Sequence, residues 1–315
     1  MYSLLEVKNL SVKLKEKDVF LLKDISFTLK KGEILGILGE SGSGKSLTAL
    51  SLLGLLPKEL QYFEGKILFE GKDLLKSSSE DLVKIRGKEI SIIFQDPLSS
   101  LNPVLSIEEQ LSEVVFYHLG LKGKACKDLM IKTLQEVGVP DPEVRLRCFP
   151  HELSGGLRQR IMIAMAIICA PKILIADEPT TALDLTIQLQ IIDLLKRLNQ
   201  EKGLGIIFIT HDLGVLRWLA HRILVYYNGE ILEMADTDNL FKNPLHPYTK
   251  VLFSSYQGLE EKLISTEVSQ RKAPSQGAFC SFFERCYSPC TRAFKEAPKL
   301  IEVRSGHWVR CWQYA

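Results

Sequence analysis

The segment at residues 39–46, Gly-Glu-Ser-Gly-Ser-Gly-Lys-Ser, constrains the fold of this chain more than any other feature. It matches the pattern of a phosphate-binding loop. The apolar run at residues 34–38 predicts a strand buried on both faces, and the apolar spacing at residues 47–56 predicts a helix. The alternative is a flexible Gly-Ser turn, which would require neither a buried strand before it nor a helix after it. The order of strand, loop and helix therefore indicates a site for phosphate groups.

Each residue type in this loop suits the binding of phosphate. The glycines let the backbone turn so that successive N–H groups point at the anion, and the helix N-terminus adds its positive end. We expect Lys45 to reach the terminal phosphates and Ser46 to ligate Mg²⁺. The candidate phosphate-binding residues are Gly39, Glu40, Ser41, Gly42, Ser43, Gly44, Lys45 and Ser46.

Two carboxylates, Asp177 and Glu178, follow a second buried apolar run at residues 173–176. Neighbouring residues of a strand point to opposite sides, so we expect the two acids to have different functions. Asp177 suits a contact with Mg²⁺ and its water, whereas Glu178 suits polarising the water that attacks phosphorus. The alternative is that both acids only solvate a strand end. Their occurrence in one chain with the phosphate loop favours the catalytic interpretation.

A third motif, at residues 153–160, reads Leu-Ser-Gly-Gly-Leu-Arg-Gln-Arg and predicts a helix start. Ser154, Gly155 and Gly156 would leave N–H groups and the positive end of the helix dipole facing outward, toward another anion. Taken alone, this motif indicates only a well-capped helix.

The spacing of apolar residues predicts an α/β fold. Alternation within residues 4–29 predicts an antiparallel sheet, and helical spacing at about 106–139 predicts a helical subdomain inserted into the sheet core. Apolar runs at 173–176 and 205–210 are separated by a helical pattern at 186–198. This arrangement is typical of parallel strands joined by a crossover helix.

Length and charge narrow the possible functions. With 315 residues, the chain is long enough for one large nucleotide-handling domain and an appendage. Its 40 basic and 38 acidic residues leave a formal charge of +2, which does not favour nucleic-acid binding. The longest apolar stretches, such as residues 161–170, are shorter than the roughly 18 to 20 residues of a membrane helix, and the N-terminus lacks signal-peptide features. We therefore expect a cytoplasmic protein.

The order of the motifs resembles that of the ATP-binding-cassette (ABC) ATPases, because the helix-start motif lies between the phosphate loop and the Asp-Glu strand. The resemblance extends to about residue 234. Within it, Gln95 is similar to the Q-loop glutamine, Asp184 of the segment 182–184 to the D-loop, and His211 to the switch histidine. It implies a RecA-like core with an antiparallel β subdomain and a helical subdomain at about 100–170.

The same resemblance implies ATP and Mg²⁺ as cofactors, bound by a domain that spans residues 1–250. It also implies a head-to-tail pair of such domains, in which residues 154–156 of one face the ATP held by the other. His211 would hold the γ-phosphate, and Gln95 would contact Mg²⁺ and transmit closure to a membrane partner. Many relatives stack an aromatic ring on adenine, and the aromatic residue nearest to that position here is Phe20.

Three further segments, at residues 96–103, 150–160 and 243–249, resemble the dipeptide/oligopeptide (peptide/nickel) importer ATPases. That branch implies an ATP-hydrolysing motor at the cytoplasmic face of the bacterial plasma membrane, most often with peptides as cargo. Its partners would be a second, similar ATPase subunit, two transmembrane permeases and an extracytoplasmic cargo-binding protein, with no nucleic acid. Alternatives are import of nickel or another small solute, or a soluble ABC ATPase of DNA repair or translation. The soluble relatives usually have a coiled-coil insertion or fused cassettes, which this sequence lacks.

The predicted C-terminal extension, residues 251–315, is rich in cysteine. The resemblance extends to this tail, where relatives have a set of thiolates, and thiolate sets suit a [4Fe-4S] cluster or zinc. Relatives place the third ligand seven residues after the second, where this chain has Ala293 instead. A cluster, a zinc site and reduced cysteines that pack a small domain all remain open. The four candidate residues are Cys280, Cys286, Cys290 and Cys311.

Overall fold

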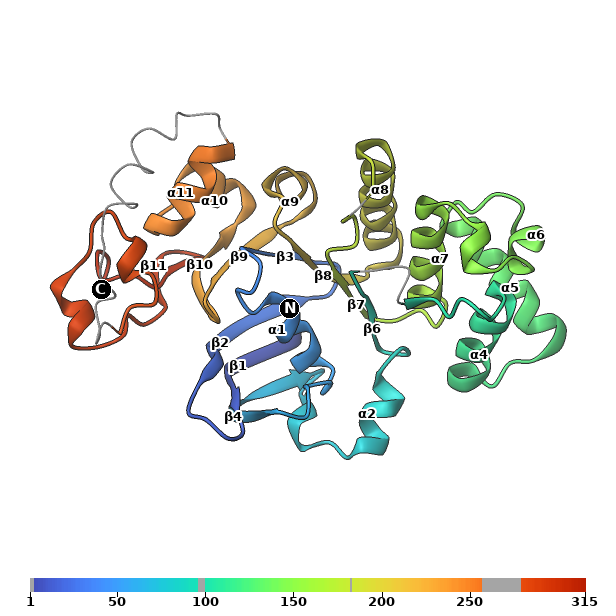
Figure 1. The fold of residues 1–315 in the computed structure, drawn as a ribbon, viewed down its shortest axis with the longest axis horizontal. Helices are drawn as coiled ribbons and strands as arrows, with labels where there is room; N and C mark the ends of the chain where they lie inside the picture. The colour runs from blue at the N-terminus through green and yellow to red at the C-terminus, as the bar shows by residue number, and fades with distance from the viewer. Residues whose placement is uncertain (1–2, 96–99, 182, 257–278) are drawn as a thin grey trace.

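The computed structural model describes residues 3–95, 100–181, 183–256 and 279–315. Two β-sheets form the framework of the molecule (Figure 1). Figure 1 shows helices α4 to α7 at one end of the larger sheet and the last residues of the chain at the other end. The smaller sheet lies against the middle of the larger one.

The smaller sheet is antiparallel and has the strand order β2-β1-β4-β5. The alternation of apolar and polar residues explains its strands, because every second side chain faces a core shared with the larger sheet. Its strands are β1 (Ser3–Leu14), β2 (Phe20–Lys30), β4 (Leu60–Phe69) and β5 (Lys72–Asp73).

The larger sheet has eight strands in the order β11-β12-β10-β9-β3-β8-β7-β6. The five strands from β9 to β6 are parallel, and β3, β7 and β8 are buried along their whole length. Continuous apolar runs suit these positions, since both faces of these strands are buried, one under helices and the other largely against the smaller sheet. Its strands are β3 (Ile34–Gly39), β6 (Ile90–Ile93), β7 (Ile173–Asp177), β8 (Gly205–Thr210), β9 (Arg222–Tyr227), β10 (Glu230–Asp236), β11 (Ile301–Arg304) and β12 (His307–Val309).

Helices connect and cover these strands. Among the described residues, the helices that follow β6 in the sequence and precede β7 are α4 (Ile107–Leu119), α5 (Gly123–Glu136), α6 (Pro142–Leu146) and α7 (Gly155–Ile167). The others are α1 (Lys45–Leu52), α2 (Ser79–Ile85), α8 (Leu185–Lys202), α9 (Leu213–Leu219), α10 (Thr237–Lys242) and α11 (Pro247–Tyr256).

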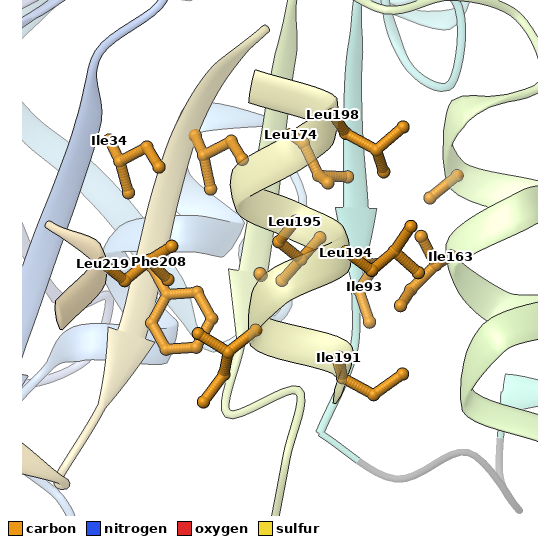
Figure 2. Close-up of a cluster of buried hydrophobic side chains, with 14 of the residues drawn as sticks. Ile34, Ile93, Ile163, Leu174, Ile191, Leu194, Leu195, Leu198, Phe208 and Leu219 are labelled. Atoms are coloured by element: carbon orange, nitrogen blue, oxygen red, sulfur yellow. The ribbon is translucent and has the colours of Figure 1, made fainter. Parts of the chain in front are cut away.

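Helix α8 packs its apolar face on the parallel strands (Figure 2). Each fully buried aliphatic side chain there contributes roughly 2 kcal/mol of transfer free energy. Ile163 of α7 packs against the same cluster, which joins the helices after β6 to the sheet. The apolar side chains of α8 in this core are Ile191, Ile192, Leu194, Leu195 and Leu198.

The end of the chain adds two strands to the larger sheet. Strand β12 pairs antiparallel with β10, and β11 pairs with β12. At this junction the buried carboxylate of Glu233 lies 2.7 Å from Nε2 of His307. Glu233 also accepts hydrogen bonds from the backbone N–H groups of Leu245, at 2.7 Å, and His246, at 2.8 Å. These contacts satisfy a buried charge that would otherwise be costly.

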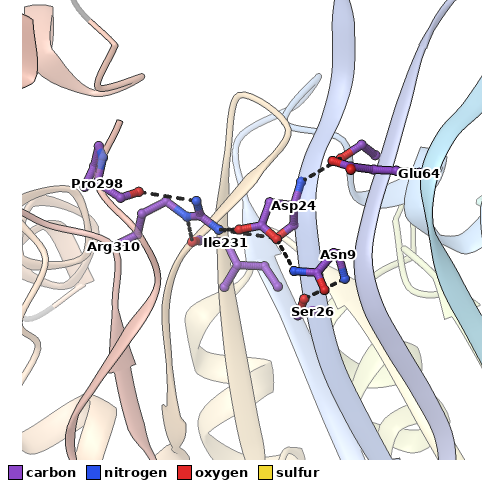
Figure 3. A network of polar contacts seen from close by, with 8 residues as sticks. Asn9, Asp24, Ser26, Glu64, Ile231, Pro298 and Arg310 are labelled. Atoms are coloured by element: carbon purple, nitrogen blue, oxygen red, sulfur yellow. Dashed lines mark hydrogen bonds and ion pairs between the residues drawn. The ribbon is translucent and has the colours of Figure 1, made fainter. Parts of the chain in front are cut away.

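Arg310 joins the C-terminal extension to the antiparallel sheet (Figure 3). Its guanidinium donates to the backbone oxygens of Ile231, at 3.1 Å, and Pro298, at 3.3 Å. It also donates to Oδ2 of Asp24, at 3.0 Å, while Oδ1 of Asp24 accepts a 2.7 Å bond from Asn9. Arg310 is only 5% exposed, whereas the Asp24 side chain is 44% exposed, so the network runs from the interior of the junction to the surface.

The predicted α/β fold is confirmed, with its antiparallel opening and its βαβ connection through α8. The helix predicted at residues 47–56 ends earlier, at Leu52. Strands β11 and β12 were not predicted from the aperiodic tail. The proposed boundary at residue 250 stays a prediction, and the segment 257–278 beyond it lies outside the described residues.

Candidate nucleotide site

A pocket of about 740 Å³ opens where the carboxyl ends of β3, β7 and β8 meet. Ligands of open α/β sheets bind at this edge. The predicted phosphate loop lines one side, and Glu178 and His211 line the other. The complete lining consists of Leu21, Glu40, Ser41, Gly42, Gly44, Lys45, Ser46, Leu47, Gln95, Glu178, Thr181 and His211.

The phosphate loop requires glycine at defined points. A Cβ atom on Gly39 would lie 2.5 Å from the backbone oxygen of Tyr226, and Gly44 has a φ of +101°. Lys45 is 5% exposed, and its Nζ donates to the backbone oxygens of Gly39 and Glu40, both at 2.8 Å. Burial lowers the pKa of Lys45, although nearby carboxylates oppose this shift. An incoming phosphate would replace these carbonyl partners with a stronger, charge-assisted bond.

Asp177 and Ser46 fit the requirements of a magnesium site. The carboxylate of Asp177, at the end of β7, is 7% exposed and bonded to the Ser46 side chain, while its Oδ1 has no hydrogen-bond partner. Burial raises the pKa of Asp177, with a further contribution from the charge of Glu178. An unpartnered carboxylate oxygen beside a hydroxyl is a suitable ligand set for a hard cation.

Glu178 lies at the centre of a polar cluster. Its φ of +46° turns the chain directly after β7, so its side chain faces the pocket rather than continuing the strand pattern. Gln95 Nε2 donates to Glu178 Oε2 at 3.2 Å, and Thr181 Oγ1 donates to the same oxygen at 3.0 Å. Nδ1 of His211 lies 3.5 Å from the other carboxylate oxygen. The three segments that follow β6, β7 and β8 thus bring the predicted Gln95, Glu178 and His211 together with Thr181.

The helix-start motif lies away from this pocket. Ser154 caps α7, where its Oγ accepts a 3.4 Å bond from the N–H of Leu157. Gly156 packs tightly on Ile187, because an added Cβ would lie 2.9 Å from that side chain. None of the residues 154–156 lines the pocket. Asp184 does not line it either, and caps α8 instead; residue 182 of the predicted D-loop lies outside the described residues.

Sequence patterns did not assign a binding role to three of the lining residues, Leu21, Leu47 and Thr181. Thr181 follows Glu178 by three residues and carries no motif of its own beyond that proximity. Leu21 also lines the pocket, whereas its neighbour Phe20 packs edge-on against Phe63 with ring centroids 5.1 Å apart. Phe20, the aromatic residue nearest to the expected adenine-stacking position, is thus not among the residues that line the pocket.

The cysteines of the tail do not support a metal cluster. In the described part of the chain, no group of three or more His, Cys, Asp or Glu residues is arranged to hold a metal ion. Cys280, Cys286 and Cys311 are close enough to interact electrostatically, and burial raises the pKa of Cys280 and that of Cys311, the latter to about 11. Without a metal ion, such burial favours protonated thiols. Cys290, the displaced fourth candidate, precedes the helical turn Thr291–Phe294.

The phosphate loop, the carboxylates of Asp177 and Glu178 at the end of β7 and the histidine after β8 define a P-loop ATPase of the ABC class. Residues 22–181 match the family model described as ABC transporter, and residues 232–289 match the oligopeptide/dipeptide transporter C-terminal region. The chain therefore belongs to the ABC transporter ATPases, in the group that carries this C-terminal region.

Curated relatives match over their full length. The oligopeptide transport ATP-binding protein AppD of Bacillus subtilis is 42% identical and covers 100% of this chain and 98% of its own. The oligopeptide transport ATP-binding protein OppD of Haemophilus influenzae is 44% identical, with 99% and 98% covered.

Solved structures share the cassette fold. A dimeric ATP-binding cassette bound to ADP and phosphate is 29% identical, with a TM-score of 0.66 over 74% of this chain and 98% of that one. CbiO1 of Clostridium perfringens, part of an ABC transporter complex, is 26% identical, with a TM-score of 0.68 over 82% and 96%. Among the described residues, none of the helices combines the length and hydrophobicity needed to cross a membrane.

Proposed function

We propose that this chain is the ATP-hydrolysing motor subunit of an importer for dipeptides or oligopeptides. The observation that carries the proposal is similarity across the whole length to ATP-binding proteins of peptide transport, including the C-terminal region that the ABC domain alone lacks. The proposal includes neither an iron–sulfur cluster nor zinc, because the residues that the structure describes contain no group of three or more His, Cys, Asp or Glu arranged to hold a metal ion.

The phosphate loop would bind the ATP phosphates through its backbone N–H groups and Lys45. Ser46, Asp177 and Gln95 would hold Mg²⁺, and the Oδ1 of Asp177, which has no hydrogen-bond partner, is available as a ligand. Bound Mg²⁺ supplies positive charge that neutralises the phosphates as the bond to the γ-phosphoryl group breaks. Lys45 would exchange its two backbone carbonyl partners for phosphate oxygens.

Glu178 would act as the carboxylate that polarises the attacking water. Its two oxygens are held by Gln95, Thr181 and His211, which orient the carboxylate toward the pocket. His211, whose side chain is 64% exposed, is free to turn toward the γ-phosphate and position the water with Glu178. These groups act by orientation and charge, which supply most of the rate enhancement in phosphoryl transfer.

A second ATPase subunit would complete the site. Ser154, Gly155 and Gly156 lie outside the pocket of their own chain, and the N-terminus of α7 can offer N–H groups to ATP held by a partner. On the next helix, Leu185 is 70% exposed and Leu189 is 54% exposed. Large apolar side chains at this exposure suit a protein interface. We infer a head-to-tail pair with a similar, non-identical ATPase, in which Asp184 lies near the shared boundary.

Two permease subunits would dock where α2 faces α4. A pocket of about 780 Å³ opens there and is lined by residues of both helices, including Val83, Tyr117 and His118. Two exposed phenylalanines belong to neighbouring segments. Phe94, directly after β6, is 42% exposed, and Phe116 of α4 is 51% exposed. This surface would receive the membrane partners and place the chain at the cytoplasmic face of the bacterial plasma membrane. An extracytoplasmic protein would deliver the cargo.

The cargo assignment is tested on the complex that co-purifies with this chain from its native membrane. In lipid vesicles that contain the cargo-binding protein, we expect a mixture of short peptides to stimulate ATP hydrolysis severalfold and Ni²⁺ to have no effect. Stimulation by Ni²⁺ alone would replace peptide by nickel as the cargo. Purification of an active ATPase without any permease would contradict the importer assignment itself.

A further inference from the structure

The C-terminal extension reaches the phosphate loop through one ion pair. Arg285, at the end of the helical turn Phe283–Arg285, lies 245 residues from Glu40 in the sequence. Its Nη1 donates to Glu40 Oε2 and its Nη2 donates to Glu40 Oε1, both at 2.9 Å. Two parallel bonds between a guanidinium and a carboxylate fix orientation as well as distance.

Aromatic rings hold the guanidinium of Arg285 in place. It lies 5.5 Å from the ring centroid of Tyr227 and 5.9 Å from that of Phe282. The hydroxyl of Tyr248 accepts a 3.4 Å bond from the backbone N–H of Glu40, and Tyr248 is fully buried. Both the backbone and the side chain of Glu40 are therefore held by residues that follow β10.

The extension that carries Arg285 is itself anchored. Its strand β12 pairs with β10, the Glu233–His307 contact is buried, and Arg310 bonds to Asp24 of the antiparallel sheet (Figure 3). These contacts limit how far the segment around Arg285 can move from the loop.

The charge of Glu40 gives this ion pair a consequence for nucleotide binding. Glu40 lines the same pocket as Lys45, and its backbone oxygen accepts a bond from Lys45 Nζ. Without Arg285, the carboxylate of Glu40 would repel the phosphates of a nucleotide. Because the Glu40 side chain is 44% exposed, solvent would reduce this repulsion but not remove it. We propose that Arg285 is a positioning residue of the nucleotide site, which orients Glu40 and cancels its charge.

This proposal rests on the ATP-binding role and is tested by a double-mutant cycle on the full-length chain with Mg²⁺ and a fluorescent ATP analogue. We expect Arg285→Ala to weaken binding about threefold to tenfold, and Arg285→Lys to weaken it less because the charge remains. In the Glu40→Gln background, Arg285→Ala should change the affinity less than twofold, since no carboxylate is left unpaired.

Arg292→Ala is the matched control, because Arg292 is an exposed arginine of the same extension that pairs with Glu296 instead. The affinity of the Arg292→Ala variant for the ATP analogue should stay within twofold of wild type. Thermal unfolding would verify the fold of each variant. An equal loss of affinity from Arg285→Ala in both backgrounds would overturn the proposal in favour of a purely structural role, as would no loss in either. Wild-type protein that failed to bind the analogue would instead overturn the ATP-binding role together with the proposal.

Discussion

Asp177 is a buried carboxylate. In the folded protein its ionised form is unfavourable unless the proposed cation is bound. Burial raises its pKa, and its Oδ1 has no partner. Because the folded state disfavours the ionised form, Asp177→Asn should stabilise the protein at pH 7 in the absence of nucleotide and Mg²⁺, by about 1 kcal/mol. The same substitution should lower Mg²⁺-dependent ATP hydrolysis at least tenfold.

Thermal unfolding in a chelator and ATPase titration with Mg²⁺ measure these two effects. Asp193→Asn, on the exposed face of α8, serves as the control and should change neither. An Asp177→Asn protein that is less stable but fully active would rule out the assigned role.

The sequence predicted most of the residues that gather at the pocket. Glu178 and His211 each follow a buried strand, and a parallel sheet brings the carboxyl ends of its strands to one edge. Arg285 and Tyr248 could not be predicted, since their contacts with Glu40 depend on how distant segments pack and leave no local pattern.

At the scale of elements, α7 combines a structural and a proposed functional role at its first turn. Ser154 caps the helix, so Ser154→Ala should cost about 1 kcal/mol of unfolding free energy. Ser154→Asp keeps a capping side chain and should preserve stability. In the proposed pair, however, the new carboxylate would face the partner's ATP, and hydrolysis should fall at least tenfold.

Chemical unfolding and steady-state ATPase activity of the purified complex separate these effects. Ser78, which caps α2 in the same way, offers a control, because Ser78→Asp should alter neither stability nor turnover appreciably. Wild-type turnover in Ser154→Asp would contradict the placement of Ser154 against a second nucleotide.

The long elements were predicted well because their periodicity extends over many residues, as in β1 and α8. Strands β11 and β12 were missed for a physical reason. They have four and three residues, too few for a periodic pattern, and their position depends on pairing with β10 and on the buried contact between His307 and Glu233. Contacts distant in sequence, rather than local propensity, specify such short strands.

At the scale of the whole molecule, the junction between cassette and extension should make stability depend on pH. His246 is buried there, and burial lowers its pKa to about 3, so it stays neutral in the folded state while the unfolded chain takes up a proton near pH 6.5. The contribution of His246 to the free energy of unfolding is fully present above pH 6.5 and is lost progressively as the pH drops toward 3. Between pH 7.5 and 5.5 the loss should be about 1.4 kcal/mol.

Urea unfolding at both pH values would measure this loss. His246→Asn provides the matched comparison, because an asparagine oxygen can replace Nδ1 as the acceptor of the 3.0 Å bond from the N–H of Tyr248 and does not titrate. The variant should be less stable overall and lose less stability on acidification. An unchanged pH dependence would exclude His246 as the source.

The central claim is that this chain turns over ATP at the cluster around Glu178, and the most direct test is Glu178→Gln in the co-purified complex. Glutamine keeps the size of the side chain and a carbonyl oxygen for its neighbours, but it cannot polarise water as a carboxylate does. We predict ATP binding within about threefold of wild type and steady-state hydrolysis reduced at least a hundredfold. Robust turnover by Glu178→Gln would contradict the account.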